Sequence, residues 1–92
     1  MRKIFKYDLA TEGGVLSIPL GSKILSVAEQ GNRIRLWAEV EVHDPDNFDV
    51  HVEYDCINTG DQPPHDDAMI FRGTVLLDRG SYVKHVYVSD PT

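Results

Sequence analysis

Apolar and polar residues alternate along much of this chain, and the alternation predicts β-strands. The clearest case is 33–42, where every even position from Ile34 to Val42 is apolar and the odd positions hold arginine, tryptophan or glutamate. Successive side chains of a strand point to opposite faces, so this segment is expected to form a strand with one buried face. Segment 48–56 repeats the pattern. Its residues expected to point inward are Phe48, Val50, Val52, Tyr54 and Cys56.

Residues 43–47 join these two segments and are rich in turn formers. We therefore predict a β-hairpin in which Val40 faces Val50. A shift by one residue would turn the apolar side chains outward, so the parity of the pairing is well specified. On the outer face this register places Glu39 opposite His51, Arg35 opposite Asp55, and Glu41 opposite Asp49. The first two pairs attract and the third repels.

Weaker alternation marks five further segments: 3–9, 15–20, 23–29, 69–77 and 81–88. Valine and isoleucine favour a strand over a short helix in 23–29, which also lacks helix caps. Gln30-Gly31-Asn32 predicts a tight turn, and Gly73 predicts a bulge or break in 69–77. The residues of that segment expected to lie together are Met69, Phe71, Val75 and Leu77. About seven short, mainly antiparallel strands at this spacing predict an all-β domain, a small β-sandwich or barrel.

Length and composition predict one cytoplasmic domain. The 92 residues are expected to form a single β domain, 1–92. No apolar run reaches the ~18 residues of a membrane span, and the N-terminus lacks the apolar stretch of a signal peptide. The single cysteine, Cys56, excludes an internal disulfide and suits a reducing compartment. We therefore expect a protein of the cytoplasm that does not contact a membrane.

Charge is segregated along the chain. The formal net charge is −6, and between Leu36 and Phe71 there is no lysine or arginine. That stretch contains Glu39, Glu41, Asp44, Asp46, Asp49, Glu53, Asp55, Asp61, Asp66 and Asp67. A concentrated negative field attracts basic groups and repels nucleic acid. We therefore expect a partner protein with a basic surface and no direct binding of nucleic acid.

No motif in the sequence indicates catalysis, a metal or a cofactor. Asp44 and Asp46 lack the spacing of a calcium loop, and the four histidines show no zinc-ligand spacing. Cys56 follows an apolar alternation, where a thiol is usually inert. His85 is expected to be a packed, hydrogen-bonded core histidine. We predict a protein that is not an enzyme and has no catalytic residue, metal site or cofactor.

Trp37 lies on the charged face of 33–42, between Arg35 and Glu39. An aromatic side chain ringed by charge is typical of an interface anchor. The alternative is that the second sheet or a neighbouring subunit of a homo-oligomer covers it. Loop 58–68 is long for a small domain and is expected to be functional or disordered. The residues predicted to bind the partner are Trp37, Glu39, Glu41, Asp49, Glu53, Asp55, Asp61, Asp66 and Asp67.

Several short segments occur in an order and spacing that resemble a known family. They are MRKIFKY at 1–7, KILSV at 23–27, LWA at 36–38, GTV at 73–75 and HV at 85–86. The family consists of small proteins encoded by tailed bacteriophages and prophages, and the resemblance covers nearly the whole chain. It implies a phage origin, a small all-β domain and a bacterial host cytoplasm, and it implies no activity or functional residues. The acid-rich middle and the 61–67 loop depart from the family.

Charge segregation and this resemblance together predict a phage accessory protein that binds and inhibits a host protein, such as a component of a defence system. Its carboxylates would imitate a phosphate backbone and occupy a basic groove. Two alternatives stay open. One is an oligomer that sequesters a small molecule or nucleotide at a subunit interface lined by Arg33, Arg35, Arg72, Arg79, Tyr7 and Tyr82. The other is a minor virion or assembly component that self-associates through Trp37 or a sheet edge.

Overall fold

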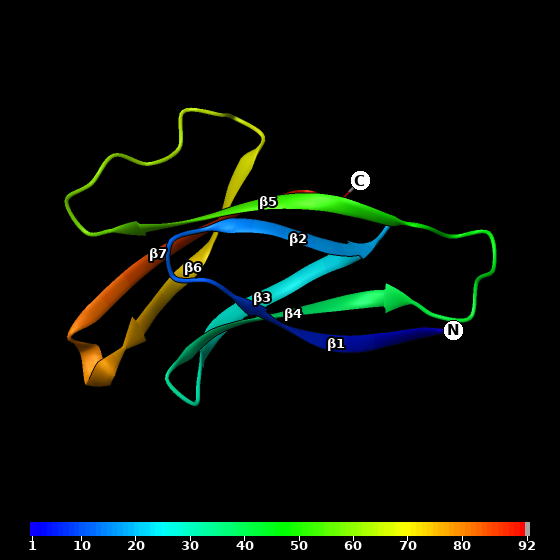
Figure 1. Ribbon diagram of the computed structural model, residues 1–92, viewed down its shortest axis with the longest axis horizontal. Coiled ribbons are helices and arrows are strands. Elements are labelled where there is room, and N and C mark those ends of the chain that lie inside the picture. Colours follow the sequence, from blue (N-terminus) through cyan, green and yellow to red (C-terminus); the bar gives the residue numbers. More distant parts are fainter. Residues whose placement is uncertain (92) are drawn as a thin grey trace.

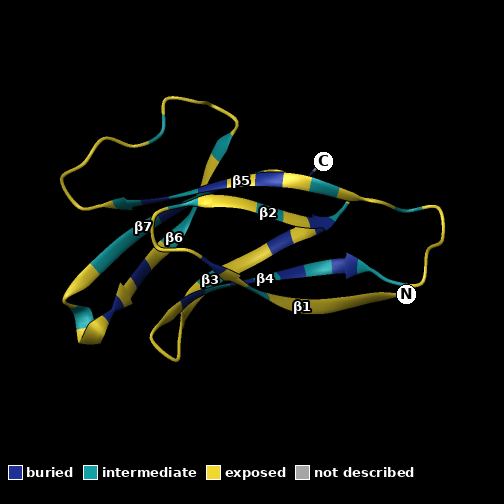
Figure 2. Cartoon of the chain, viewed as in Figure 1, coloured by how far each residue is buried: buried dark blue, intermediate teal, exposed yellow. Residues whose placement is uncertain are grey.

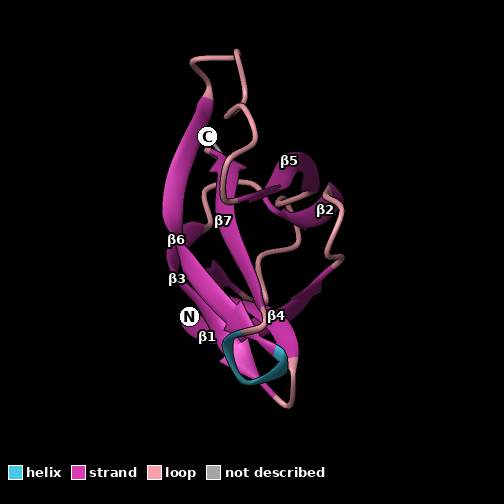
Figure 3. Cartoon of the chain, turned by 90° about the vertical axis from the view of Figure 1, so that its left-hand side faces the viewer, coloured by secondary structure: helices cyan, strands magenta, loops and turns pink. Residues whose placement is uncertain are grey.

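Two antiparallel sheets face each other in the computed structural model, which describes residues 1–91 (Figure 1). The strands are β1 (Arg2–Leu9), β2 (Gly14–Pro19), β3 (Lys23–Gln30), β4 (Arg33–Glu41), β5 (Asp49–Asn58), β6 (Met69–Leu77) and β7 (Tyr82–Ser89). The only helical element in this part of the chain is a 3-10 turn at Asp78–Gly80 (Figure 3). The predicted all-β fold with seven short strands is confirmed.

One sheet has three strands in the order β1-β4-β3, and the other has four in the order β2-β5-β7-β6. The molecule is flat and elongated, with extents of 43 × 30 × 16 Å. Over residues 1–91 no helix is long and apolar enough to cross a membrane.

The core lies between the sheets because each sheet turns its apolar alternation toward the other. Buried and half-buried residues alternate along most of β4, as Figure 2 shows. Burying a side chain such as Leu36 or Val52 contributes roughly 1.5–3 kcal/mol. The largest fully buried side chains are Ile18, Ile34, Leu36, Val40, Val52, Val75, Val86 and Val88.

The predicted hairpin between 33–42 and 48–56 is wrong, although both strands exist. β4 pairs with β1 and β3, whereas β5 pairs with β2 and β7. Residues 42–48 therefore cross from one sheet to the other. Two strands that face each other across a core have the same alternation as two that pair side by side, so the pattern does not distinguish them. Phe48, predicted to point inward, lies in the crossing segment and is 61% exposed.

The hairpin between β3 and β4 forms as predicted. Gln30 pairs with Arg33, and both residues between them have positive φ, 61° at Gly31 and 61° at Asn32. Positive φ at both central positions defines a type I′ turn, whose twist matches that of the flanking strands. Asparagine tolerates this conformation better than most residues.

The bulge predicted at Gly73 is also present, as a register shift between Phe71 and Gly73. Because the bulge adds a residue, it reverses which side chains of β6 point inward. Val75 and Leu77 are buried, whereas Phe71 lies on the outer face. The prediction that these three residues and Met69 share one face is therefore wrong.

The four sheet edges differ in how they are protected. β3 lies along β6, and a Cβ at Gly73 would be 3.0 Å from Val27 Cγ2. On β2, the Leu20 N–H donates to the Phe48 carbonyl at 2.9 Å. Alternate residues of the ladder face β5, so Pro19 faces the free edge, where its missing N–H removes a donor. β1 is the remaining free edge.

Candidate functional site

The structure divides the predicted partner-binding residues between the two outer faces of the sandwich. Trp37, Glu39 and Glu41 lie on β4 in the three-stranded sheet, whereas Glu53 and Asp55 lie on β5 in the four-stranded sheet. The remaining residues are Asp49 at the start of β5, and Asp61, Asp66 and Asp67 in the β5–β6 loop, 59–68. The acidic stretch of the sequence therefore does not form one continuous face.

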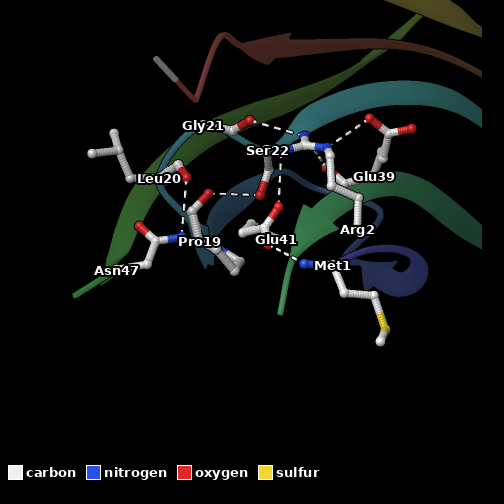
Figure 4. A network of polar contacts seen from close by, with 9 residues as sticks. All are labelled: Met1, Arg2, Pro19, Leu20, Gly21, Ser22, Glu39, Glu41 and Asn47. Carbon is white, nitrogen blue, oxygen red and sulfur yellow. Dashed lines mark hydrogen bonds and ion pairs between the residues drawn. The ribbon is translucent and has the colours of Figure 1, made fainter. Parts of the chain in front are cut away.

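Basic groups pair with the carboxylates of the three-stranded sheet (Figure 4). Arg2 Nε lies 2.8 Å from Glu39 Oε2, and Arg2 Nη1 lies 3.8 Å from Glu41 Oε2. The Met1 ammonium also pairs with Glu41. Arg2 further donates to the Gly21 carbonyl at 3.2 Å, which ties β1 to the β2–β3 turn. These contacts follow from β1–β4 pairing and offset the negative charge on this face.

Trp37 is half-buried on the same face, between one basic and one polar residue. On β4 it lies opposite Lys6 of β1 on one side and Ser26 of β3 on the other. Lys6 itself donates to Gln30 Oε1 at 2.9 Å. Trp37 is therefore on the opposite sheet from the carboxylates of β5, and the two cannot form a single contact patch.

An open groove of about 650 Å³ lies on the four-stranded sheet between the β1–β2 turn and the β5–β6 loop. Among residues 1–91, four carboxylates line this acidic groove, and neither lysine nor arginine does. The four carboxylates are Glu12, Glu53, Asp55 and Asp66. Three of them were predicted to bind a partner.

The β1–β2 turn forms one wall of the groove by lying directly on β5. Gly13 has φ 100°, and a Cβ there would be 2.9 Å from the Tyr54 carbonyl oxygen and 3.0 Å from Asp55 Oδ1. Only glycine combines this φ with such close backbone approach at little cost. The Tyr54 hydroxyl accepts a hydrogen bond from the Ala10 N–H at 2.8 Å, which holds the β1–β2 turn against β5. These contacts bring Glu12 beside the carboxylates of β5.

Sequence reasoning missed Glu12, which lies outside the stretch 37–70 that contains no lysine or arginine. The signal that could have found it is the pair Gly13-Gly14, because adjacent glycines mark a place where a backbone approaches another closely. A Cβ at Gly14 would be 3.0 Å from Tyr54 Oη.

The β5–β6 loop forms the other wall. In the sheet order β7 lies between β5 and β6, so this loop must pass β7 to reach β6. It rises on the side of the four-stranded sheet that faces away from the other sheet (Figure 1). The residues of this loop that line the groove are Gln62, Pro63, Pro64, His65 and Asp66. Asp66 Oδ1 accepts the Ala68 N–H at 2.9 Å, which holds the loop end in a turn.

The other predicted acids lie outside the groove. Asp49 pairs with Pro19 at the opposite end of β5. Asp61 accepts a hydrogen bond from Asn58 Nδ2 at 3.3 Å and lines a smaller hollow beside His85. Asp67 is exposed and does not line the groove.

His85 is hydrogen-bonded as predicted, but it is not in the core. Its Nε2 lies 2.8 Å from Thr59 Oγ1 and its Nδ1 lies 3.0 Å from Thr74 Oγ1. Val86 and Val88 are the residues of β7 that point inward. The predicted alternation of β7 is therefore correct, but the residues predicted to point inward, His85 among them, point outward.

The basic and aromatic residues of the alternative small-molecule site are distributed over both sheets of the chain. Arg33 and Arg35 both pair with Asp8 on the three-stranded sheet. Arg72 donates to a β7 carbonyl of the other sheet at 3.3 Å. Tyr7 packs against the core from β1.

Cys56 and the metal-ligating residue types show no reactive arrangement in the described part of the chain. Cys56 is buried, and burial raises the pKa of its thiol to about 11, an effect that Lys84 opposes and Asp55 and Glu12 reinforce. A protonated, buried thiol is a poor nucleophile. Within residues 1–91 no three His, Cys, Asp or Glu side chains are placed to hold a metal ion.

The fold and the groove define a small all-β sandwich domain with one carboxylate-lined outer face. The chain belongs to the family described as Domain of unknown function (DUF7352), whose family model matches residues 1–92. No curated protein matches the chain, and no solved structure matches it.

Proposed function

We propose that this protein is a binding protein and not an enzyme, and that its acidic groove binds a basic segment of a partner protein. The observation that carries the proposal is the convergence of Glu12, Glu53, Asp55 and Asp66, with no lysine or arginine of the described chain lining the groove. The contrast with Glu39, which pairs with Arg2 at 2.8 Å, supports the choice of this face.

The walls of the groove suit the side chains of lysine and arginine. Val15, Pro63, Pro64 and Met69 contribute apolar surface beside the carboxylates. Lysine and arginine place their aliphatic stems on apolar surface while their charged heads reach polar groups. Exposed charge pairs of this kind raise the association rate and the specificity more than the final affinity.

The proposal extends to a biological role. A protein with this groove that comes from a phage would bind a nucleic-acid-binding protein of the bacterial host and inhibit it by occupying its basic surface. Glu53 and Asp55 project from the same face of a rigid strand, with Asp55 half-buried and Glu53 exposed. Carboxylates held on a rigid strand resemble phosphates in charge, which supports a mimic of nucleic acid.

Paired charge reversals test the binding proposal. Glu53→Lys with Asp55→Lys changes the groove, whereas Asp44→Lys with Asp46→Lys makes the same change in net charge in the exposed run 43–46. Binding of a fluorescent lysine- and arginine-rich peptide is followed by anisotropy at low salt. We expect the groove variant to weaken binding by about tenfold or more, and the control to change it much less.

Equal losses in the two variants would mean that only net charge matters, which contradicts the proposal. Unchanged binding by the groove variant would contradict it as well. Circular dichroism checks that both variants keep the β fold.

A further inference from the structure

β1 is an edge strand with an unusually exposed surface. It ends the order of the three-stranded sheet, and only Tyr7 and Leu9 of its eight residues are shielded from solvent. Ile4 is 61% exposed and Phe5 is 42% exposed. A long edge strand with exposed apolar residues is a template for pairing with another strand.

The ladder with β4 shows which backbone groups of β1 are free. The Val42 N–H donates to the Met1 carbonyl at 2.8 Å. Hydrogen-bonded pairs alternate along an antiparallel ladder, so the backbone groups of Lys3, Phe5 and Tyr7 face β4. The even-numbered residues, Arg2, Ile4, Lys6 and Asp8, turn their N–H and C=O groups to the free edge.

We propose that two copies of this protein pair antiparallel through the free edges of β1, with the two Phe5 residues facing each other on the two-fold axis. Arg2 then lies opposite the partner's Asp8, and Ile4 lies opposite the partner's Lys6. The two sheets join into one of six strands. The even-numbered residues of both copies make the new backbone hydrogen bonds, because these are the residues whose N–H and C=O groups face the free edge.

Charge on the outer face selects this register. Arg2 pairs with Glu41 within the chain, and Asp8 pairs with Arg35. Across the joined sheet the order is therefore Glu41, Arg2, the partner's Asp8 and the partner's Arg35, in which the signs alternate. A shift of two residues in one direction places Arg2 opposite the partner's Lys6, and in the other direction Lys6 opposite the partner's Lys6. Like charges directly opposite each other destabilise a strand pair.

The inner face of the pair is complementary too. Phe5 meets the partner's Phe5, and Lys3 meets the partner's Tyr7. Aromatic pairs and a cation beside an aromatic ring both attract. The register thus leaves no charged residue of β1 opposite a like charge.

The other sheet edges are less suited to pairing with a second copy. Of the other edges, β3 lies along β6, and the free edge of the six-residue β2 carries Pro19. β1 is the edge best able to pair.

A cysteine at the two-fold axis tests the register. Phe5→Cys places two thiols in a non-hydrogen-bonded pair, where the Cα atoms are about 4.5 Å apart and a disulfide can form. Ile4→Cys is the matched control, because its two copies would be about 8–9 Å apart. Under mild oxidation we expect a covalent dimer from Phe5→Cys and none from Ile4→Cys. Cys56 is buried in both.

Ile4→Pro tests the edge itself. The Ile4 N–H faces away from β4, so proline there spares the bonds within the chain and removes a donor from the pair. We expect light scattering to give a dimer for the wild type and for Ile4→Ala. Ile4→Pro should raise the dimer dissociation constant by about tenfold or more, because symmetry removes the donor twice.

Three results would overturn the proposal. The first is a wild type that stays monomeric up to millimolar concentration. The second is an Ile4→Pro variant that is folded by circular dichroism and dimerises as tightly as the wild type. The third is a wild-type dimer in which Ile4→Cys cross-links as readily as Phe5→Cys, because the pair would then have another register or surface.

Discussion

Replacing Gly13 by alanine is expected to destabilise the fold and to distort the acidic groove. Gly13 has φ 100°, and its new Cβ would stand 2.9 Å from the Tyr54 carbonyl oxygen and 3.0 Å from Asp55 Oδ1. The carbonyl belongs to the backbone of a central strand and has little freedom to move. The Asp55 side chain must therefore shift, and the turn must lift from β5.

The expected loss has two parts. Holding alanine in this region of φ costs about 1–3 kcal/mol, and overpacking against β5 adds about 1–3 kcal/mol. Gly60→Ala separates the two parts, because Gly60 has φ 96° and no atom lies within 4 Å of its added Cβ. We therefore expect Gly13→Ala to lower the free energy of unfolding by about 1–3 kcal/mol more than Gly60→Ala does.

Urea unfolding followed by the fluorescence of Trp37, the only tryptophan, measures both losses. Equal destabilisation by the two variants would show that the contact with β5 is not tight. Gly13→Ala should also weaken binding of the basic peptide at a temperature where both variants are folded. Unchanged binding there would separate the β1–β2 turn from the groove.

Three further predictions concern the core and the turn. Leu36→Ala should lower the free energy of unfolding by about 2–5 kcal/mol, and Leu25→Ala, which is on the exposed side of β3, by much less; similar losses would contradict the assigned facing. Tyr54→Phe should cost about 1 kcal/mol because the Ala10 N–H loses its acceptor; no loss in urea would contradict this. The Cys56 thiol has a pKa of about 11 in the fold against 9.0 as its ordinary value. Its contribution to stability is therefore full below pH 9.0 and is lost as pH rises through about 11. Thermal melts of the wild type should fall more steeply across this range than melts of Cys56→Ala, and parallel curves would refute the assignment.

The strands could be predicted from the sequence because their alternation is local information. The Gly31-Asn32 turn could be predicted for the same reason. Glycine and asparagine tolerate positive φ, which both central residues of this turn adopt. The choice of neighbouring strands could not, because β4 and β5 each show one apolar face whether they pair or oppose each other. The connection 42–48 is long enough for either arrangement, and the wrong hairpin followed from that ambiguity.

The site was predictable only in part. Glu53, Asp55 and Asp66 come from one acidic stretch, and the fold brings them to one groove. Glu39 belongs to the same stretch but lies beside Arg2, and that contact depends on the pairing of β1 with β4. Glu12 joins the groove through the β1–β2 turn and lies 41 positions before Glu53 in the sequence. Contacts between distant segments decide which carboxylates are available, and residue spacing alone does not reveal them.

Affinity capture from a bacterial lysate with the wild type and the two charge-reversal variants tests the proposed function most directly. We predict that the wild type and Asp44→Lys with Asp46→Lys retain the same basic, nucleic-acid-binding protein in stoichiometric amount. Glu53→Lys with Asp55→Lys should release it, and added salt should release it from the wild type. Retention of that protein by the groove variant, or recovery of the bait alone from the wild type, would contradict the role of the acidic groove.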